Sequence, residues 1–343
     1  MFILVSDISI GDFVQVKSHE VRIEKSVHSF LEVAYIKIPL RSRVVGEYTI
    51  NGQILETSKI FKEGMRVSIN LGYTGQMLNE FEGFIARLNF KSPMEIVCEG
   101  YSYQLRKRTY LKIFKNSTLR EILKYLVIGT DIVLDKDIDD VPITKFDMQG
   151  LSGIEVLRKL KTTALHNAVS FRFIKNVLIA EVFPIKQERG VVEYLMGWNV
   201  IDANDLAKHE AENDDVEIHF IGIRSDGTKV LSKAGKLKKP IIKTGSAGIE
   251  SGELKVFTSH EIHDKVALGK MANAKHSQIT FDGYKGKITT FLQPYCEPGY
   301  KAIIEDKTYP ERGGNYIIEA VEVTYGMSGA RRKVSIGMQL DKK

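Results

Sequence analysis

Short segments of alternating apolar and polar residues fill both ends of this 343-residue chain and constrain its fold more than any other feature. Residues 67–73 alternate in this way near the N-terminus, and residues 216–220 and 334–340 do so toward the C-terminus. Alternation places every second side chain on one face of a sheet. Turn-forming pairs such as Asn51-Gly52 and Glu63-Gly64 separate the segments. Both ends therefore predict small barrels or sandwiches of short strands.

One N-terminal segment changes its alternation partway along. The apolar residues first occupy odd-numbered positions, at Leu31, Val33 and Tyr35. They then occupy even-numbered positions, at Ile36, Ile38 and Leu40. A parity switch of this kind predicts a β-bulge within the strand, which is common where a sheet curls.

The middle of the chain has a different pattern, with signals for helices. Residues 118–121 and 152–155 are capping boxes, in which a Thr or Ser and a Glu three residues later satisfy each other's amides. An apolar stripe with helical spacing follows each box. Lys175 and Asn176 then separate two apolar runs and predict a hairpin. Residues 104–189 are therefore predicted to form a small α/β module.

Two further features lie in the C-terminal β region. A third capping box at residues 258–261 predicts one helix over about residues 259–277. Residues 229–243 carry six lysines together with Gly and Pro, which predicts an exposed loop between strands. No repeat of 20 to 50 residues is visible, so a solenoid is not expected.

The sequence contains no recognisable set of catalytic or metal-binding residues. Gly-x-x-x-x-Gly-Lys-Ser/Thr, Gly-x-Gly-x-x-Gly and Gly-x-Ser-x-Gly are all missing. His260 and His263 are three residues apart, whereas zinc proteases place their helical histidines four apart. Glu261 between them is predicted to cap a helix. We therefore expect no catalytic, cofactor-binding or metal-binding residues, and no cofactor.

Other conspicuous residues are interpreted as structural. The acidic cluster at Glu210, Glu212, Asp214, Asp215 and Glu217 lacks the Gly of a calcium loop and favours a solvated face. A packing role is predicted for the single tryptophan, a turn position for the Arg331-Arg332 pair, and buried free thiols for both cysteines: Trp198, Arg331, Arg332, Cys98 and Cys296.

The termini and the charge exclude other classes of protein. Residues 1–7 are expected to form a first strand and not a signal peptide, because no basic segment or cleavage site accompanies them. No apolar run approaches the roughly 20 residues of a membrane span, so no stable membrane insertion is expected. The net charge of +6 is modest for a nucleic-acid-binding protein.

Several short motifs resemble phage baseplate hubs. Residues 81–88 (FEGFIARL), 95–101 (EIVCEGY) and 104–106 resemble the end of the first barrel in that family, which includes late-control protein D, the Mu-type hub and the hub part of type VI secretion spike proteins. Residues 292–299, 302–305 and 314–323 resemble its C-terminal part. Two departures stand out: Tyr300 follows the Pro-Gly pair, and no spike β-helix or lysozyme domain precedes the end at Lys343. The spike would then be a separate polypeptide.

This resemblance implies a mainly β fold with an α+β insert. Two tube-like antiparallel β-barrel domains, residues 1–103 and 190–343, would flank the α/β module at 104–189. The implied function is structural, with no enzyme activity. A homotrimer would join the sixfold tail tube to the threefold spike and contact other baseplate proteins, with DNA only as passing cargo. Its implied location is the baseplate of a virion tail or injection system, assembled in the bacterial cytoplasm.

Three alternatives stay open from the residues alone. The first is a distal-tail or tube adaptor of a non-contractile phage, which would be hexameric. The second is a tail hydrolase that degrades cell-wall glycan or peptide, which needs paired carboxylates or a zinc site. The third is a plain carbohydrate- or protein-binding module. The sequence does not distinguish a phage from a tailocin or a secretion system.

Overall fold

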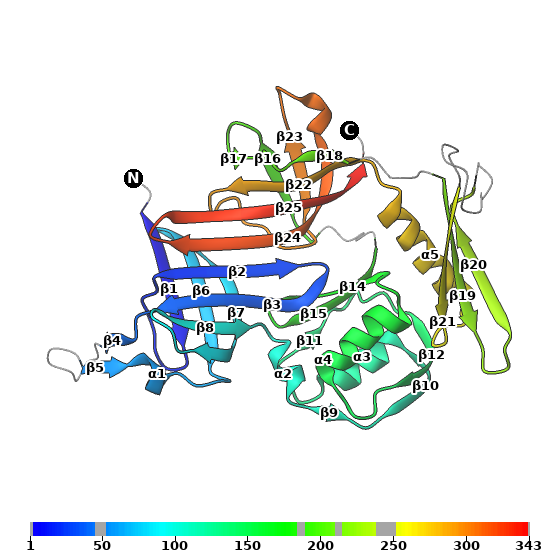
Figure 1. Ribbon diagram of the computed structural model, residues 1–343, viewed down its shortest axis with the longest axis horizontal. Helices are drawn as coiled ribbons and strands as arrows, with labels where there is room; N and C mark the ends of the chain where they lie inside the picture. The colour runs from blue at the N-terminus through cyan, green and yellow to red at the C-terminus, as the bar shows by residue number, and fades with distance from the viewer. Residues whose placement is uncertain (1–2, 45–52, 184–188, 210–214, 238–251, 342–343) are drawn as a thin grey trace.

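The computed structural model describes residues 3–44, 53–183, 189–209, 215–237 and 252–341 (Figure 1). It is mostly β, with 52% of residues in strands and 16% in helices, which confirms the predicted mainly β class. The N-terminal elements are β1 (Leu4–Ile10), β2 (Glu20–Ser26), β3 (Ser29–Ile38), β4 (Arg41–Val44), β5 (Gln53–Glu56), α1 (Thr57–Ile60), β6 (Arg66–Tyr73), β7 (Gln76–Asn89) and β8 (Met94–Glu99).

The middle elements are α2 (Tyr103–Arg106), β9 (Thr109–Tyr110), β10 (Ile113–Thr118), α3 (Leu119–Val127), β11 (Val133–Leu134), β12 (Pro142–Asp147), β13 (Leu151–Ser152), α4 (Gly153–Lys159), the π-helical turn η1 (Leu160–Ala164), β14 (Val169–Ile174) and β15 (Val177–Val182). The C-terminal elements are β16 (Val191–Leu195), β17 (Val200–Asp202), β18 (Ala207–His209), β19 (Val216–Ile223), β20 (Lys229–Ala234), β21 (Glu253–Ser259), α5 (Lys265–Ile279), β22 (Gly283–Thr290), β23 (Lys301–Glu305), η2 (Pro310–Arg312), β24 (Gly314–Gly326) and β25 (Gly329–Asp341).

Strands from the two ends of the chain form one 13-stranded sheet, the blue and red strands of Figure 1. Its main path runs β1-β6-β7-β8-β3-β2-β24-β25-β22-β17. The ends meet where β2 pairs antiparallel with β24, from Glu20 opposite Gly326 to Ser26 opposite Ala320. A single hydrophobic core also contains residues from both ends, such as Ile36 and Ile336. The N-terminal and C-terminal strands are therefore packed as one body.

The predicted alternation is confirmed in most of these strands. Val67, Ile69 and Leu71 of β6 are buried at every second position. The bulge predicted at the switch from Tyr35 to Ile36 is wrong in position, because burial alternates from Phe30 to Ile38 and the pairing with β8 is regular there. The register of β3 against β2 does shift, but earlier in the strand, between Ser29 and Val33. The sequence pattern misled because Glu32 occupies a core position of this strand, where the alternation rule expects an apolar residue.

The middle segment folds around its two capped helices. Thr118 Oγ1 accepts the Glu121 amide at 3.3 Å, and the Glu121 carboxylate accepts the Thr118 amide at 3.1 Å. Ser152 and Glu155 form the same reciprocal pair at the start of α4. The predicted hairpin is β14–β15, with Ile174 opposite Val177. Both capping boxes and the hairpin are thus confirmed.

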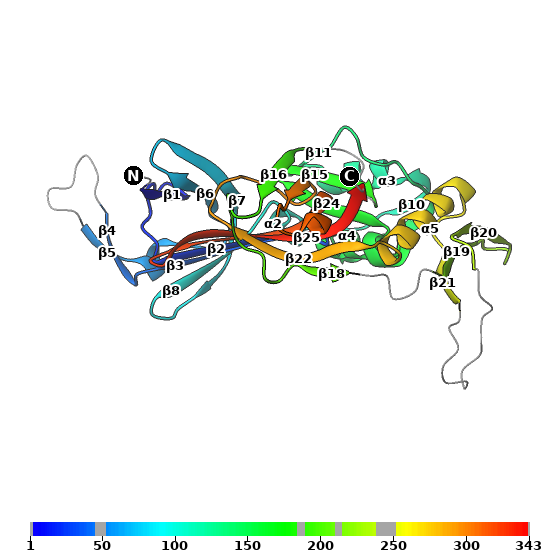
Figure 2. The same cartoon turned by 90° about the horizontal axis from the view of Figure 1, so that it is seen from above.

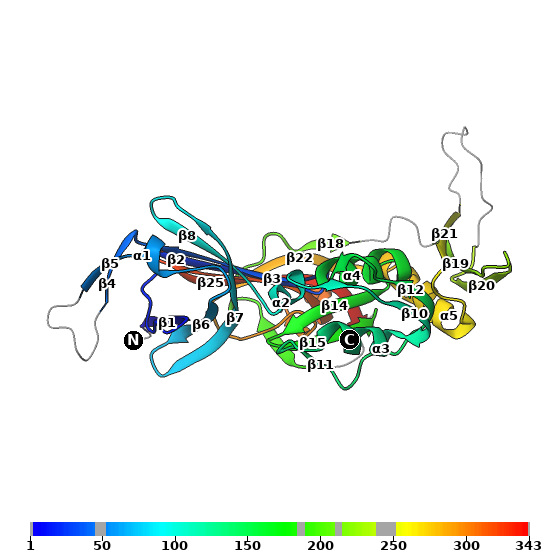
Figure 3. The same ribbon diagram turned by 90° about the horizontal axis from the view of Figure 1, so that it is seen from below.

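A three-stranded sheet, β20-β19-β21, with α5 packed on it, lies at the end of the molecule opposite the β4–β5 hairpin (Figures 2 and 3). The predicted capping box at 258–261 is wrong, since Thr258 and Ser259 belong to β21 and the helix begins at Lys265. Asp264 caps it by accepting the Ala267 amide at 2.7 Å. Parallel pairing of residues 253–259 with β19 gives this segment sheet hydrogen bonds in place of helical ones.

The predicted lysine-rich loop is also corrected. Residues 229–234 form β20, which pairs antiparallel with β19 along its whole length. Residues 238–243 lie outside the described part of the chain. Lysines alternate outward along β20 while Ser232 and Ala234 face α5, so a strand accommodates the charge without burying it.

Candidate functional site

Five charged side chains are buried beneath the pairing of β2 with β24, and we call this group the charged joint. It comprises Lys25 of β2, Glu32 of β3, Glu80 of β7, Glu297 of the segment before β23, and Arg332 of β25. Three of the groups come from the N-terminal strands and two from the C-terminal segments. The charged joint therefore connects the two ends of the chain inside their common core.

Arg332 and Glu80 form the first ion pair of the joint. Arg332 Nη2 donates to Glu80 Oε1 at 2.6 Å, and the two side chains are 1% and 2% exposed. The guanidinium also donates to the carbonyls of Leu292 at 3.1 Å and Cys296 at 3.4 Å. Burial alone would lower the pKa of Arg332, but the Glu80 carboxylate raises it, so the guanidinium stays charged.

Lys25 and Glu297 form the second ion pair. Lys25 Nζ lies 2.6 Å from Glu297 Oε1, and the hydroxyl of Tyr295 donates to the same oxygen. Burial opposes the charge on Lys25, and Glu297 together with Glu32 raises its pKa above the usual value. Glu297 Oε2 is buried and has no hydrogen-bond partner among the described residues. One acceptor in the joint is thus left unused by this pair.

Glu32 is the fifth group, and within the described part of the chain it forms no ion pair of its own. It is 5% exposed, and its carboxyl lies against Gly100, where the methyl group of an alanine would lie 3.0 Å from Glu32 Oε2. Burial raises the pKa of Glu32 to about 8, only partly offset by Lys25, and Glu297 raises it further. The joint therefore contains three carboxyl groups and two cations.

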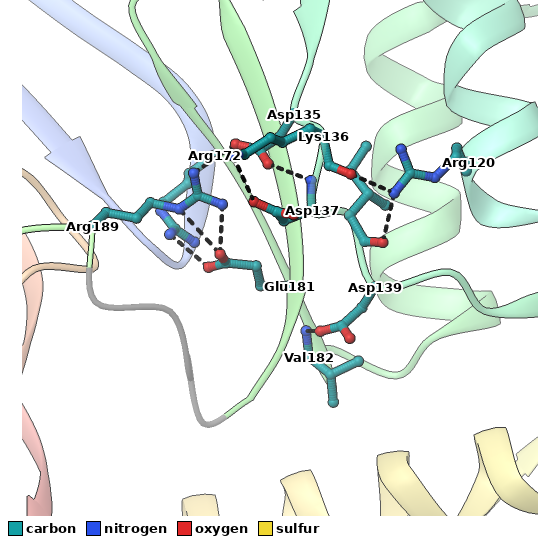
Figure 4. A network of polar contacts seen from close by, with 10 residues as sticks. Arg120, Asp135, Lys136, Asp137, Asp139, Arg172, Glu181, Val182 and Arg189 are labelled. Carbon is teal, nitrogen blue, oxygen red and sulfur yellow. Dashed lines mark hydrogen bonds and ion pairs between the residues drawn. The ribbon is translucent and has the colours of Figure 1, made fainter.

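A second polar network holds Arg189, the last residue of the 104–189 segment, against the rest of that segment (Figure 4). Arg189 precedes β16 and binds Asp135 at 2.6 Å and Glu181 at 2.7 Å. Glu181 also receives Arg172 Nη2 at 2.7 Å inside the protein. Burial alone would raise the pKa of Asp135, but hydrogen bonds from Arg189 and from the Asp137 amide hold it below the usual value. These contacts hold Arg189 against the segments that carry Asp135 and Glu181.

The two histidines singled out in the sequence are not brought together with further ligands. His263 Nε2 lies 2.8 Å from the Ile223 carbonyl, and His260 is exposed. Glu261 does not cap a helix, because its carboxylate accepts from the Ser259 hydroxyl at 3.2 Å and the His260 amide at 3.1 Å. Among the described residues, no three His, Cys, Asp or Glu side chains are placed to hold a metal ion.

The acidic cluster falls only partly within the structure. Glu210, Glu212 and Asp214 lie outside the described residues. Glu217 binds Lys233 at 3.1 Å and also contacts His219 across the outer face of β19. Asp215 is only 5% exposed, so the predicted solvated face is wrong at that residue.

Two other interpretations are corrected. Trp198 is 84% exposed in the turn after β16, so it is not a packing anchor in the single chain. Arg332 lies inside β25 and not in the hairpin turn, which spans Met327 and Ser328. A pair of adjacent arginines suggested solvent exposure, and only the placement of Glu80 on a distant strand explains how one of them is buried.

Both cysteines are buried free thiols, as predicted. Burial raises the pKa of Cys98, and it raises that of Cys296 to about 11. Thiolates are the reactive form, so neither residue suits nucleophilic chemistry.

A hollow of about 850 Å³ lies between the β7–β8 and β24–β25 turns. Its two carboxylates are engaged, Glu20 with Lys37 at 2.7 Å and Glu95 with Asn89 at 2.7 Å. A pair of facing carboxylates free to act as acid and base is not found in this hollow. No described helix is long and apolar enough to cross a membrane.

This fold, one sheet built from both ends of the chain with an α/β segment between them, is similar to the folds of solved phage tail proteins and of a type VI secretion component. Two solved tail proteins share it over almost their whole length. They are a 43 kDa tail protein of prophage MuSo2 from Shewanella oneidensis (11% identity, 97% of this chain and 98% of that one, TM-score 0.63) and a tail protein from Neisseria meningitidis (11%, 97% and 96%, 0.64).

A component of the Escherichia coli type VI secretion system, described as structurally similar to tail proteins of bacteriophage T4, is also similar. Its identity is 10%, the match covers 97% of this chain and 77% of that one, and the TM-score is 0.57. No family model matches the sequence, and no curated protein does. The likeness is therefore one of fold, carried by structure at an identity too low for sequence comparison.

Proposed function

We propose that this protein is a structural hub of a phage tail baseplate or a related contractile injection machine. In this proposal three copies form a ring that joins a sixfold tail tube to a separate threefold spike. Residues 1–103 and 190–343 supply the two tube-like domains of each copy, and residues 104–189 form the α/β module between them. The protein acts by assembly and catalyses no reaction.

The observation that carries the proposal is the two-way match over nearly the full length of a solved prophage tail protein. A match of 97% and 98% leaves little of either chain for an unrelated domain. The continuous sheet adds support, because a ring subunit that transmits load between a tube and a spike needs its two halves joined rigidly. The β2–β24 pairing and the charged joint provide that connection.

Two rival functions make different predictions. A distal-tail or tube adaptor would form a hexamer. A cell-wall hydrolase would need a pair of free carboxylates or a metal, and the carboxylates of the hollow between the β7–β8 and β24–β25 turns are already bonded to Lys37 and Asn89. The structural role is therefore favoured over the enzymatic one.

The test is the mass of the purified full-length chain in solution, alone and with the spike and tube proteins encoded beside it. We expect a particle of about three times the 38.7 kDa of one chain, seen as a threefold ring by electron microscopy. Six copies would indicate the tube adaptor. A chain that stays monomeric at high concentration with its spike present would refute the hub. Peptidoglycan turnover by the pure protein would refute the absence of enzyme activity.

A further inference from the structure

The charged joint contains an imbalance that the two ion pairs do not resolve. Arg332 forms an ion pair with Glu80 at 2.6 Å, and Lys25 forms an ion pair with Glu297 at 2.6 Å. Each cation thus has its own carboxylate. Glu32, buried on β3 beside them, would add a third negative charge with no cation left to balance it.

Among the described residues, two other cations near β3 already form ion pairs with carboxylates of their own. Arg172 on the neighbouring β14 is bound to Glu181, and Arg106 beyond β8 is bound to Glu99 at 2.6 Å. The groups that act most on Glu32 are Lys25, which favours its charge, and Glu297, which opposes it. Burial adds to the opposition, because a carboxylate loses its hydration inside the core.

A neutral Glu32 removes this conflict in two ways. The joint then holds two anions and two cations and carries no net charge. A protonated carboxyl also no longer repels the carboxylate of Glu297, which opposes the charge on Glu32. Protonation of Glu32 thus removes the negative charge that the two ion pairs leave unbalanced.

We propose that the charged joint is a proton-dependent clasp, in which the two ends of the chain close around a protonated Glu32 and loosen when it ionises. The clasp acts on the β2–β24 pairing, since Lys25 lies on β2 and Arg332 lies on β25, the next strand beyond β24. This inference does not depend on the proposed hub function, because it concerns the single chain.

The direction of the pH effect follows from the two pKa values of Glu32. In the unfolded chain the pKa is near the usual value of 4.5, and in the fold it is about 8. Between these values the folded chain holds a proton that the unfolded chain has lost, so the stability due to Glu32 falls as the pH rises. The folding equilibrium should fall about tenfold per pH unit in this window and stay level above it.

The experiment compares urea unfolding of the wild type, Glu32→Gln and Glu24→Gln from pH 5 to pH 9.5, using the full chain. Gln keeps the shape of a protonated Glu and cannot ionise. The ratio of the folding constants of Glu32→Gln and the wild type should therefore grow about tenfold per pH unit up to pH 8 and then level off. Glu24→Gln is the matched control, since Glu24 lies on β2 with its side chain 40% exposed, and its ratio should stay nearly constant.

Amide hydrogen exchange locates the effect. Above pH 8 the amides of residues 20–26 and 320–326 should exchange faster in the wild type than in Glu32→Gln at the same pH. A ratio of folding constants that does not change with pH would overturn the proposal, and so would equal exchange rates in this pairing.

A measurement on the wild type decides the case if Glu32→Gln fails to fold. Infrared spectroscopy in heavy water detects the carbonyl band of a protonated carboxylic acid separately from carboxylates. We expect such a band in the folded wild type at neutral pH and its loss with a midpoint near 8. The absence of the band at neutral pH would refute a protonated Glu32.

Discussion

Replacing Arg332 by Met should destabilise the protein more than replacing its neighbour Arg331 in the same strand. Arg332 is 1% exposed and bonds to Glu80 and to two backbone carbonyls. Met preserves most of the apolar volume but leaves the Glu80 carboxylate, 2% exposed, without its counter-charge. Removal of one partner of a buried ion pair costs about 3–5 kcal/mol.

Urea unfolding at pH 7, followed by circular dichroism, measures this loss as a lower midpoint at unchanged slope. The matched control is Arg331→Met on the adjacent residue, which is partly exposed and lies over the Phe291 ring. We expect the control to change stability by less than about 1 kcal/mol.

The double variant Glu80→Met with Arg332→Met separates the pair from the packing. With no uncompensated charge left, it should be more stable than the sum of the two single losses predicts, by about 1–3 kcal/mol. Equal losses for Arg331→Met and Arg332→Met, or strict additivity in the double variant, would contradict the reasoning that the ion pair is a coupled, desolvated unit.

Two further predictions concern helix caps and an exposed aromatic side chain. Thr118→Ala and Ser152→Ala should each lower the free energy of unfolding by about 1 kcal/mol, because both hydroxyls cap helices; Thr258→Ala, in strand β21, should show no such capping loss, and a comparable loss there would restore the discarded capping box. Trp198, 84% exposed in the single chain, should become shielded from an aqueous quencher when the chain assembles, and Trp198→Ser should weaken the assembly without changing monomer stability by more than about 0.5 kcal/mol. Unchanged quenching between dilute and assembled protein would exclude Trp198 from the interface.

Local signals in the sequence were sufficient for the class of fold and for several elements. Alternation at residues 67–73 and 334–340 predicted strands that the structure contains, because burial on one face of a sheet imposes a period of two on the residues that form it. The capping boxes at Thr118 and Ser152 were equally readable, since each is a bond between residues three apart. The short hub-like motifs led to the same fold that the solved tail proteins share.

Three-dimensional packing alone decided where the charges lie. A switch in alternation between Tyr35 and Ile36 suggested a bulge and left the buried Glu32 unnoticed, and the arginine pair suggested a turn at Arg332. Their surroundings depend on partners far away in the chain: Arg332 is 252 residues from Glu80, and Lys25 is 272 residues from Glu297. The spacing of residues along the sequence does not indicate such pairs.

The same reason explains the main point that the sequence did not reveal, namely that its two β regions form one sheet. Alternation specifies which side chains face inward but not which strand lies alongside, because the backbone groups that pair β2 with β24 are the same in every strand. Local patterns thus determined the kinds of elements in this protein and their inward faces. The tertiary structure determined how the two ends meet and which charges are enclosed between them.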